Sequence, residues 1–370
     1  MKSASNRYGW TDYAKGIAIL LVLYRHVFEG IKNAGMDVGP FLYLEHANIA
    51  FFSFRMPLFF IIAGIFISKS LAKRGLLSFV ESKMKTILYV YLIWTVLQIT
   101  MQIILSQYVN ANRGWMDYLY IFYAPRYLDQ FWYLHTLFFV LILYAFVKEK
   151  LKVTMPVQIA IGLALFFMSG YFYRTGIQLY FINDIFHHYI FMATGDLVSK
   201  FFFKPDTFKK LGRWWVLLAT LPFFVLAQYF FLKINIAHID IDKGYQYIEF
   251  FIPWLYLLIA YTGCFFVIVV CFLLQNLNWL PSLRAFGQYS LYIYASHVFA
   301  TSFVRIMLVR FLGVDYIPLI LAAGILAGAA VPVWLYRISP RIGMRWLFVW
   351  PEKREGKLIS MKGFETKKVE

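Results

Sequence analysis

Charged residues, cysteines and long polar stretches are all scarce in this sequence. Only 15% of its 370 residues are Asp, Glu, Lys or Arg, whereas 61% are hydrophobic. In soluble domains about a quarter of the residues are charged. The composition therefore excludes a soluble domain and indicates a polytopic membrane protein. The two cysteines, Cys264 and Cys271, lie in one apolar run and can be explained as small core residues. Two cysteines exclude a disulfide framework.

The apolar runs predict an all-α fold of about ten transmembrane helices, because each run is long enough to cross a hydrocarbon core of roughly 30 Å. We expect a single transmembrane domain over residues 1–340 and a basic cytoplasmic tail over 341–370. The first run contains Lys15 and His26, and no cleavage site follows it, so a cleaved signal peptide is not expected. The predicted spans are 13–30, 50–68, 87–106, 131–147, 154–172, 184–200, 214–232, 249–274, 288–311 and 317–337.

The distribution of basic residues predicts the orientation. With both termini cytoplasmic, the inner segments hold 25 Lys and Arg residues and the outer loops hold six. Inner loops of membrane proteins carry this excess of positive charge. The formal net charge of +17 therefore needs no nucleic-acid partner.

The first predicted span carries ionisable residues where an ordinary span is apolar. At 3.6 residues per turn, Lys15 and His26 lie about 20° apart around the helix, and Asp12 and Glu29 fall on the same stripe. Lys15 and His26 are separated by roughly 16 Å along the axis, about half of the hydrocarbon core. Because ionisable groups inside a bilayer are costly, this stripe indicates a functional site.

Four motifs occur in order along the chain. They are DYAKGIAI from Asp12 to Ile19 with His26 after an apolar run, MPLFFIIAG from Met56 to Gly64, FWYL from Phe131 to Leu134, and GQYSLYIYASH from Gly287 to His297. Together they resemble the motifs of the acyltransferase-3 family of integral membrane acyltransferases, and the subtype looks closest to the fucose-4-O-acetylase-like branch.

The resemblance implies transfer of an acyl group, usually acetyl, from acyl-coenzyme A to a hydroxyl of a cell-surface carbohydrate. Acetyl-coenzyme A would be a cosubstrate, and no permanently bound cofactor is expected. Expected partners are membrane lipid and a carbohydrate or glycolipid acceptor, in the bacterial inner (plasma) membrane. Arg25 departs from the family, since this position is usually small or apolar, and this hints at a different acceptor.

His26 is the predicted general base, because a sugar hydroxyl is a poor nucleophile until a base removes its proton and histidine suits neutral pH. Glu29 is predicted to orient the His26 ring by a hydrogen bond. The alternatives are that His26 only joins two helices by a hydrogen bond, and that Glu29 is a solvated carboxylate at a helix end.

Asp12, Lys15, Lys83 and Lys85 are the predicted donor-binding residues, with the lysines holding the phosphates of coenzyme A at the inner face. Lysine is a point charge rather than a bidentate fork, and the family usually has arginines near 83 and 85. Alternatively, Asp12 and Lys15 form only an ion pair with each other. Lys83 and Lys85 could likewise be ordinary positive residues of an inner loop.

Arg55, Trp132, His135 and Arg25 are the predicted acceptor or oxyanion residues. Arg55 could instead reach lipid headgroups, and Trp132 could belong to an interfacial aromatic belt. His187 and His188 are expected to be solvated at a helix mouth. No two histidines have metal-ligand spacing on one helix, so a metal site is not expected.

Two other functions remain open at this point. Intramembrane charges also mark transport pathways, so a transporter or flippase of a polar or glycolipid substrate is the alternative, although the halves lack matching Gly- or Pro-broken helices. The third candidate function is that of a membrane scaffold or assembly protein.

Overall fold

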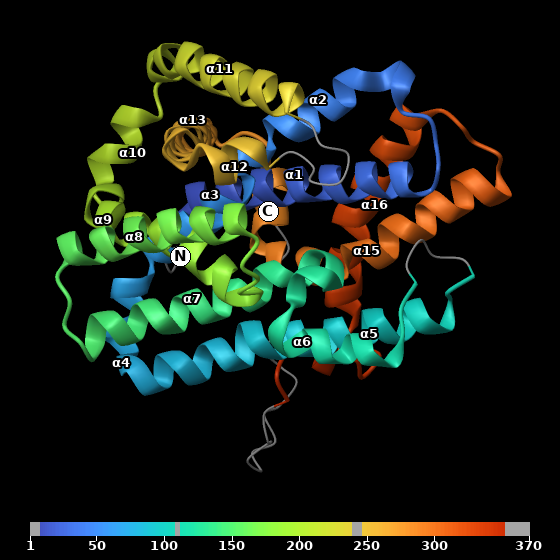
Figure 1. The fold of residues 1–370 in the computed structure, drawn as a ribbon, viewed down its shortest axis with the longest axis horizontal. Helices are drawn as coiled ribbons and strands as arrows, with labels where there is room; N and C mark the ends of the chain where they lie inside the picture. The colour runs from blue at the N-terminus through green and yellow to red at the C-terminus, as the bar shows by residue number, and fades with distance from the viewer. Residues whose placement is uncertain (1–7, 108–111, 239–245, 352–370) are drawn as a thin grey trace, which may run out of the picture.

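The computed structural model describes residues 8–107, 112–238 and 246–351, and these residues form helices joined by short turns, with no β-strand within the three ranges (Figure 1). This confirms the all-α prediction. The long helices are α1 (Gly9–Asn33), α3 (Phe52–Ile65), α4 (Ile67–Lys83), α5 (Tyr89–Ile104), α7 (Trp132–Glu149), α8 (Met155–Thr175), α9 (Phe181–Phe202), α11 (Trp214–Ala237), α13 (Pro253–Leu277), α15 (Ser290–Ile306) and α16 (Ile317–Ile338).

Shorter helices lie in the connections, where sequence patterning predicted only loops. They redirect the chain between long helices and, in the case of α14, pack against α1. They are α2 (Leu42–Ala50), α6 (Tyr120–Tyr123), α10 (Pro205–Leu211), α12 (Tyr247–Phe251) and α14 (Pro281–Gln288).

Each of the ten predicted spans overlaps a long helix, and the eleventh long helix, α4, lies almost entirely between the second and third predicted spans. Within the described ranges, eight segments are long and apolar enough to cross a membrane. The helices α1 and α9, of 25 and 22 residues, are as long but are not among the eight. Both helices have ionisable side chains spread along their length, from Asp12 to Lys32 in α1 and from Asp184 to Lys200 in α9. The exact number of spans and the cytoplasmic location of both termini stay predictions.

The helix with the polar stripe, α1, runs through the middle of the molecule (Figure 1). It packs against α3, α13, α14, α15 and α16. At 1.5 Å per residue, its 25 residues measure roughly 37 Å, enough to cross a bilayer. Fourteen of them are buried, including Asp12. Asp12 therefore faces protein, whereas Lys15, His26 and Glu29 are partly exposed.

Two motif glycines allow α1 and α14 to approach closely. A Cβ atom on Gly287 would lie 1.6 Å from the Asp12 carbonyl oxygen, and one on Gly16 would lie 2.2 Å from the Leu283 carbonyl oxygen. Backbone-to-backbone contact of this kind is typical of helix pairs in membranes. The crossing brings α14 against the inner half of the stripe.

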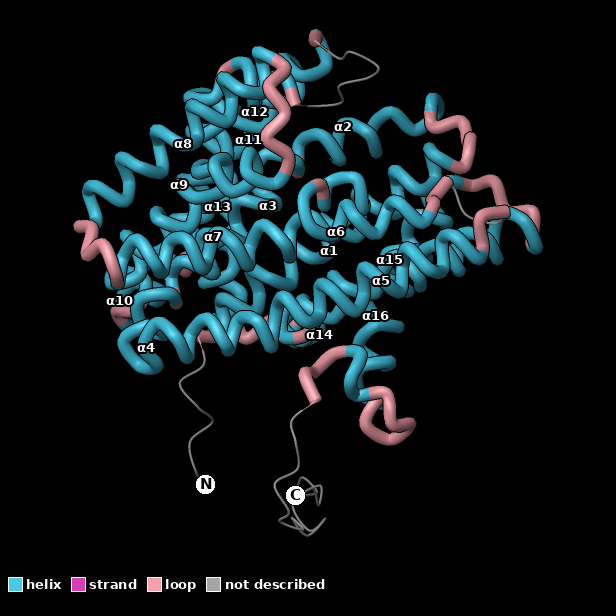
Figure 2. The backbone as a smooth tube through the Cα atoms, turned by 60° about the horizontal axis from the view of Figure 1, so that its bottom comes forward, coloured by secondary structure: helices cyan, strands magenta, loops and turns pink. Residues whose placement is uncertain are grey.

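Both described ends of the chain lie at the same edge of the molecule (Figure 2). At the first end, the Tyr8 ring packs 4.9 Å from the Phe203 ring. At the other, Tyr89 and Trp94 of α5 donate hydrogen bonds to the carbonyl oxygens of Trp346 (2.7 Å) and Leu347 (2.8 Å). Residues 345–349 thus pack against α5, and the remainder of the predicted tail, 352–370, lies outside the described residues.

Replacing Gly287 with Ala is expected to destabilise the protein by at least about 1–3 kcal/mol, since its methyl group would overlap the α1 backbone and the helices would have to separate. Thermal unfolding in detergent measures this. The matched control is Gly114→Ala, because a Cβ at Gly114 meets no atom within 4 Å. Equal unfolding temperatures for the two variants would contradict the close crossing.

Candidate active site

The stripe of α1 meets a second histidine inside the bundle. The imidazole centroids of His26 and His297 lie 5.1 Å apart. His297, from the middle of α15, is fully buried, whereas His26 is partly exposed. Within the described ranges no residue hydrogen bonds to His26, so its nitrogens are not used in a helix–helix bond there.

The hydrogen bonds of His297 fix its tautomer. Its Nδ1 lies 3.0 Å from the Ile293 carbonyl oxygen and 2.9 Å from that of Tyr294. Both oxygens are acceptors, so Nδ1 carries the proton and the lone pair of the neutral ring is on Nε2. Nε2 is buried without a hydrogen-bond partner in the described part of the chain. The sequence placed His297 in a motif but assigned it no role.

Two predicted acceptor residues, Arg25 and Arg55, lie against the Phe52 ring, with Cζ atoms 5.4 and 5.7 Å from its centroid. Arg55 is 2% exposed and donates a hydrogen bond of 3.3 Å to the Leu21 carbonyl oxygen of α1. Arg55 is therefore an interior residue rather than one that extends to lipid headgroups. Both arginines interact electrostatically with His26.

Glu29 accepts a hydrogen bond of 3.0 Å from Asn48 of α2. Its negative charge also acts on Arg25 and Arg55. Its predicted role in orienting His26 stays a prediction.

The aromatic motif of α7 reaches the histidine pair through Tyr294. The Tyr133 and Tyr294 rings lie 5.0 Å apart, and Tyr294 lies 6.0 Å from His297. Trp132 instead stacks under Arg126, whose Cζ is 4.2 Å from the Trp132 ring centroid.

His135 occupies a different environment. It is 2% exposed and packs against the rings of Tyr91, Phe139 and Phe181 at 5.4, 4.6 and 5.1 Å. Its contacts are those of a core residue, and its predicted place in the acceptor site stays a prediction.

Charged side chains from α1, α4 and α14 lie near the Asp12 end of the stripe. Asp12 is 1% exposed and receives a hydrogen bond from Gln288 (3.3 Å), with Arg284 3.9 Å away. Lys15 interacts electrostatically with Lys83, at the end of α4. Lys85 pairs with Glu81 at 2.7 Å. Lys15 and Lys83 are thus close enough for their charges to interact, and the role of both in donor binding stays a prediction.

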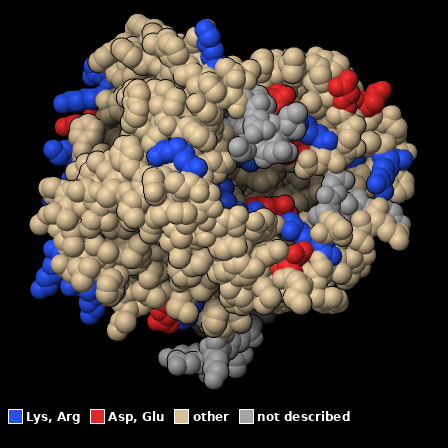
Figure 3. Space-filling view, viewed as in Figure 1, with Lys and Arg blue, Asp and Glu red and all other residues tan. Residues whose placement is uncertain are grey.

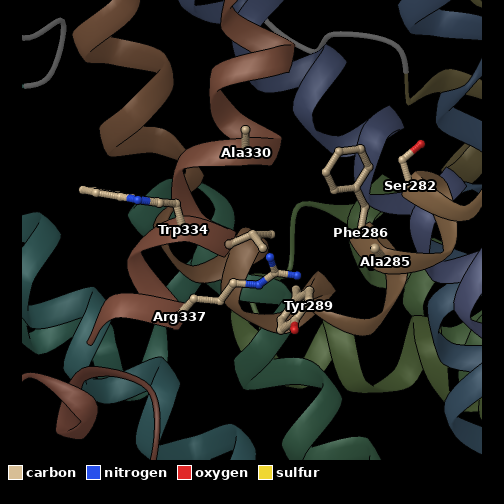
Figure 4. A pocket seen from close by; sticks show the side chains of 8 residues that line it. Ser282, Ala285, Phe286, Tyr289, Ala330, Trp334 and Arg337 are labelled. Atoms are coloured by element: carbon tan, nitrogen blue, oxygen red, sulfur yellow. The ribbon is translucent and has the colours of Figure 1, made fainter. Parts of the chain in front are cut away.

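A cavity of about 290 Å³ lies beside α14, between it and α16. Figure 4 shows Arg337 extending toward Tyr289 there, and its Cζ lies 5.4 Å from the Tyr289 ring centroid. The helix α14 therefore contacts both this cavity and the part of α1 near Asp12. The lining of the cavity offers aromatic surface, one arginine and the hydroxyl of Ser282.

The prediction that His187 and His188 are solvated is wrong. They are 2% and 3% exposed, because α8 and α12 pack over α9. His187 Nε2 lies 3.1 Å from Glu249 of α12, and His188 Nδ1 donates to the Asp184 carbonyl oxygen at 2.8 Å. Asp184 also pairs with Arg126 at 2.5 Å. Sequence patterning missed this acid–base cluster because its acidic members lie 65 residues apart.

Charged side chains also gather around a hollow in the molecular surface. Figure 3 shows the hollow between α2 and α6 in this view, with acidic and basic side chains at its rim and floor. Much of the remaining face is uncharged, as expected of a lipid-facing surface. No group of three or more metal-ligating side chains occurs in the described part of the chain.

Replacing Glu249 with Leu is expected to lower stability by about 1–3 kcal/mol, because the buried His187 ring would lose its polar partner 3.1 Å away. The double variant His187→Phe/Glu249→Leu should recover much of that loss. Thermal unfolding of the four proteins of this cycle measures the coupling, and purely additive changes would contradict a direct interaction between the two side chains.

Comparison with known proteins identifies the family of this chain. The family model of the acyltransferase-3 acyltransferase domain matches residues 8–337, which include the histidine pair, the arginines and both ends of the stripe. No curated protein and no solved structure matches this chain. The chain belongs to the acyltransferase-3 family and is a membrane acyltransferase.

Proposed function

We propose that this acyltransferase moves an acyl group, acetyl in the simplest case, from acyl-coenzyme A to a hydroxyl of a cell-surface or lipid-linked carbohydrate. The observation that carries the proposal is the buried α1 helix, which joins Lys15 and Lys83 at one end to His26 and His297 further along. A bacterial plasma membrane and the fucose-4-O-acetylase-like branch are part of the proposal.

The thioester would reach the histidines along the stripe. The phosphates of coenzyme A bind near Lys15 and Lys83, where two positive charges offset theirs. The pantetheine arm then extends along α1, over roughly 16 Å from Lys15 to His26. The cavity between α14 and α16 adds Arg337 and aromatic surface near this end, where the adenine ring could stack.

His26 acts as the general base in the transfer. Its imidazole takes the proton of the acceptor hydroxyl while the hydroxyl oxygen attacks the thioester carbonyl carbon. When the tetrahedral intermediate collapses, the carbon–sulfur bond breaks and the imidazolium returns the proton to the leaving thiolate. The negative charge that develops on the carbonyl oxygen is stabilised by the positive field of Arg55 and its neighbour Arg25. The products are the ester and free coenzyme A.

His297 supports this chemistry as a neutral neighbour. Its Nδ1 proton is held by two backbone carbonyl oxygens, so its Nε2 can accept a hydrogen bond from the protonated His26 ring. A neutral acceptor at this distance stabilises the imidazolium without adding a second positive charge.

Replacing His26 with Ala should reduce acetyl transfer about 10²- to 10⁴-fold, the usual effect of losing a general base. Purified protein, radiolabelled acetyl-coenzyme A and candidate glycans provide the assay, and a transporter would yield no labelled sugar. The control is His46→Ala, at an exposed histidine of α2. Retained transfer in the His26 variant would reject the role of this residue.

Replacing Lys15 or Lys83 with Gln should raise the KM for acetyl-coenzyme A roughly threefold to tenfold, with a smaller change in kcat, because one phosphate contact is lost. Added salt should narrow the difference from wild type, since screening weakens the same interaction. Lys233→Gln, at an exposed residue of α11, is the control. An unchanged KM in both variants would place the donor elsewhere.

A further inference from the structure

Two guanidinium groups face one aromatic ring next to the histidine pair. Arg25 comes from α1 and Arg55 from α3, and both Cζ atoms lie within 6 Å of the Phe52 ring centroid, at 5.4 and 5.7 Å. The two charges interact with each other and with His26. Arg55 also hydrogen bonds to the Leu21 carbonyl oxygen of α1, little more than one turn before His26, and both arginine charges act on the His26 ring, so an anion bound by them would lie close to the reacting hydroxyl.

Protein groups satisfy little of the hydrogen-bonding capacity of this pair. A guanidinium carries five N–H donors. Arg55, 2% exposed, makes one hydrogen bond, to the Leu21 carbonyl oxygen. In the described ranges of the chain, Arg25 makes no hydrogen bond, and neither arginine forms an ion pair.

The carboxylates in the region are already engaged. Glu29 accepts from Asn48, Glu249 pairs with His187, and Asp184 pairs with Arg126. Glu29 and Glu249 act on Arg25 electrostatically, but neither forms an ion pair with it in the described part of the chain. Two like charges kept out of water near each other are unfavourable, and burial is compensated best by a hydrogen-bonded counter-charge.

We propose that Arg25 and Arg55 together bind an anionic oxygen group of the acceptor, a phosphate or a sugar carboxylate, beside the hydroxyl that His26 deprotonates. The inference rests on the proposed function, because only an acyltransferase has an acceptor that could carry this anionic group. Planar guanidinium groups match both anions with paired N–H donors. A phosphate would belong to a lipid carrier, whereas a carboxylate would belong to the sugar itself.

The test measures binding without any acyl donor, so that it does not depend on turnover. Full-length protein in nanodiscs is titrated with farnesyl phosphate against farnesol, and with methyl glucuronide against methyl glucoside, using tryptophan fluorescence. At least one anionic probe should bind about tenfold or more tightly than its neutral match, because a charge-assisted contact is worth roughly a factor of ten. The probe that binds distinguishes lipid phosphate from sugar carboxylate.

Arg25→Gln and Arg55→Gln should each remove most of this preference, and Arg25→Lys should restore part of it. The control is Arg310→Gln, at an exposed residue beyond α15. Because Arg25 is partly exposed, its variants keep the test valid if Arg55→Gln does not fold. Equal binding of anionic and neutral probes by the wild type, or an unchanged preference in Arg25→Gln, would overturn the inference. Anion binding without acyl transfer would instead reject the proposed function.

Discussion

The cost of placing ionisable side chains within a bilayer constrains the whole architecture. Asp12, Lys15, His26 and Glu29 lie on one helix, and a low-dielectric interior tolerates them only where other polar groups or water reach them. The helices α2, α3, α13, α14, α15 and α16 pack against α1, and three of them supply Gln288, Asn48 and His297 to it. Close packing through Gly16 and Gly287 brings these partners near enough.

The same constraint separates two kinds of buried charge in this protein. Asp184, Arg126, Glu249 and His187 are paired with one another, and such pairs fix how α8, α9 and α12 pack. The groups around His26 are far less completely paired by protein. Paired groups of this kind serve structure, whereas incompletely paired groups near a hollow are typical of sites where a polar ligand completes the set.

Much of the fold could be predicted because hydrophobic runs record span length directly, and helical periodicity placed His26 and Lys15 on one face. The burial of His187 and His188 could not, since it depends on α12, a short helix that the loop sequence did not reveal. The contact of His297 with His26 depends on the packing of α15 against α1. The motif containing His297 identified the helix that carries this residue. Only the packing of the helices showed that His297 contacts His26.

The hydrogen bonds from Tyr89 and Trp94 to residues 346 and 347 have a consequence for biogenesis. Synthesis proceeds from the N-terminus, so α5 leaves the ribosome some 250 residues before the segment that covers it. The N-terminal half of α5, which contains Tyr89 and Trp94, must wait, incompletely packed, until α16 has been inserted and the chain has turned back. Closure by Phe348, which is 3% exposed, is then among the last steps of assembly and joins the fourth long helix to the end of the bundle.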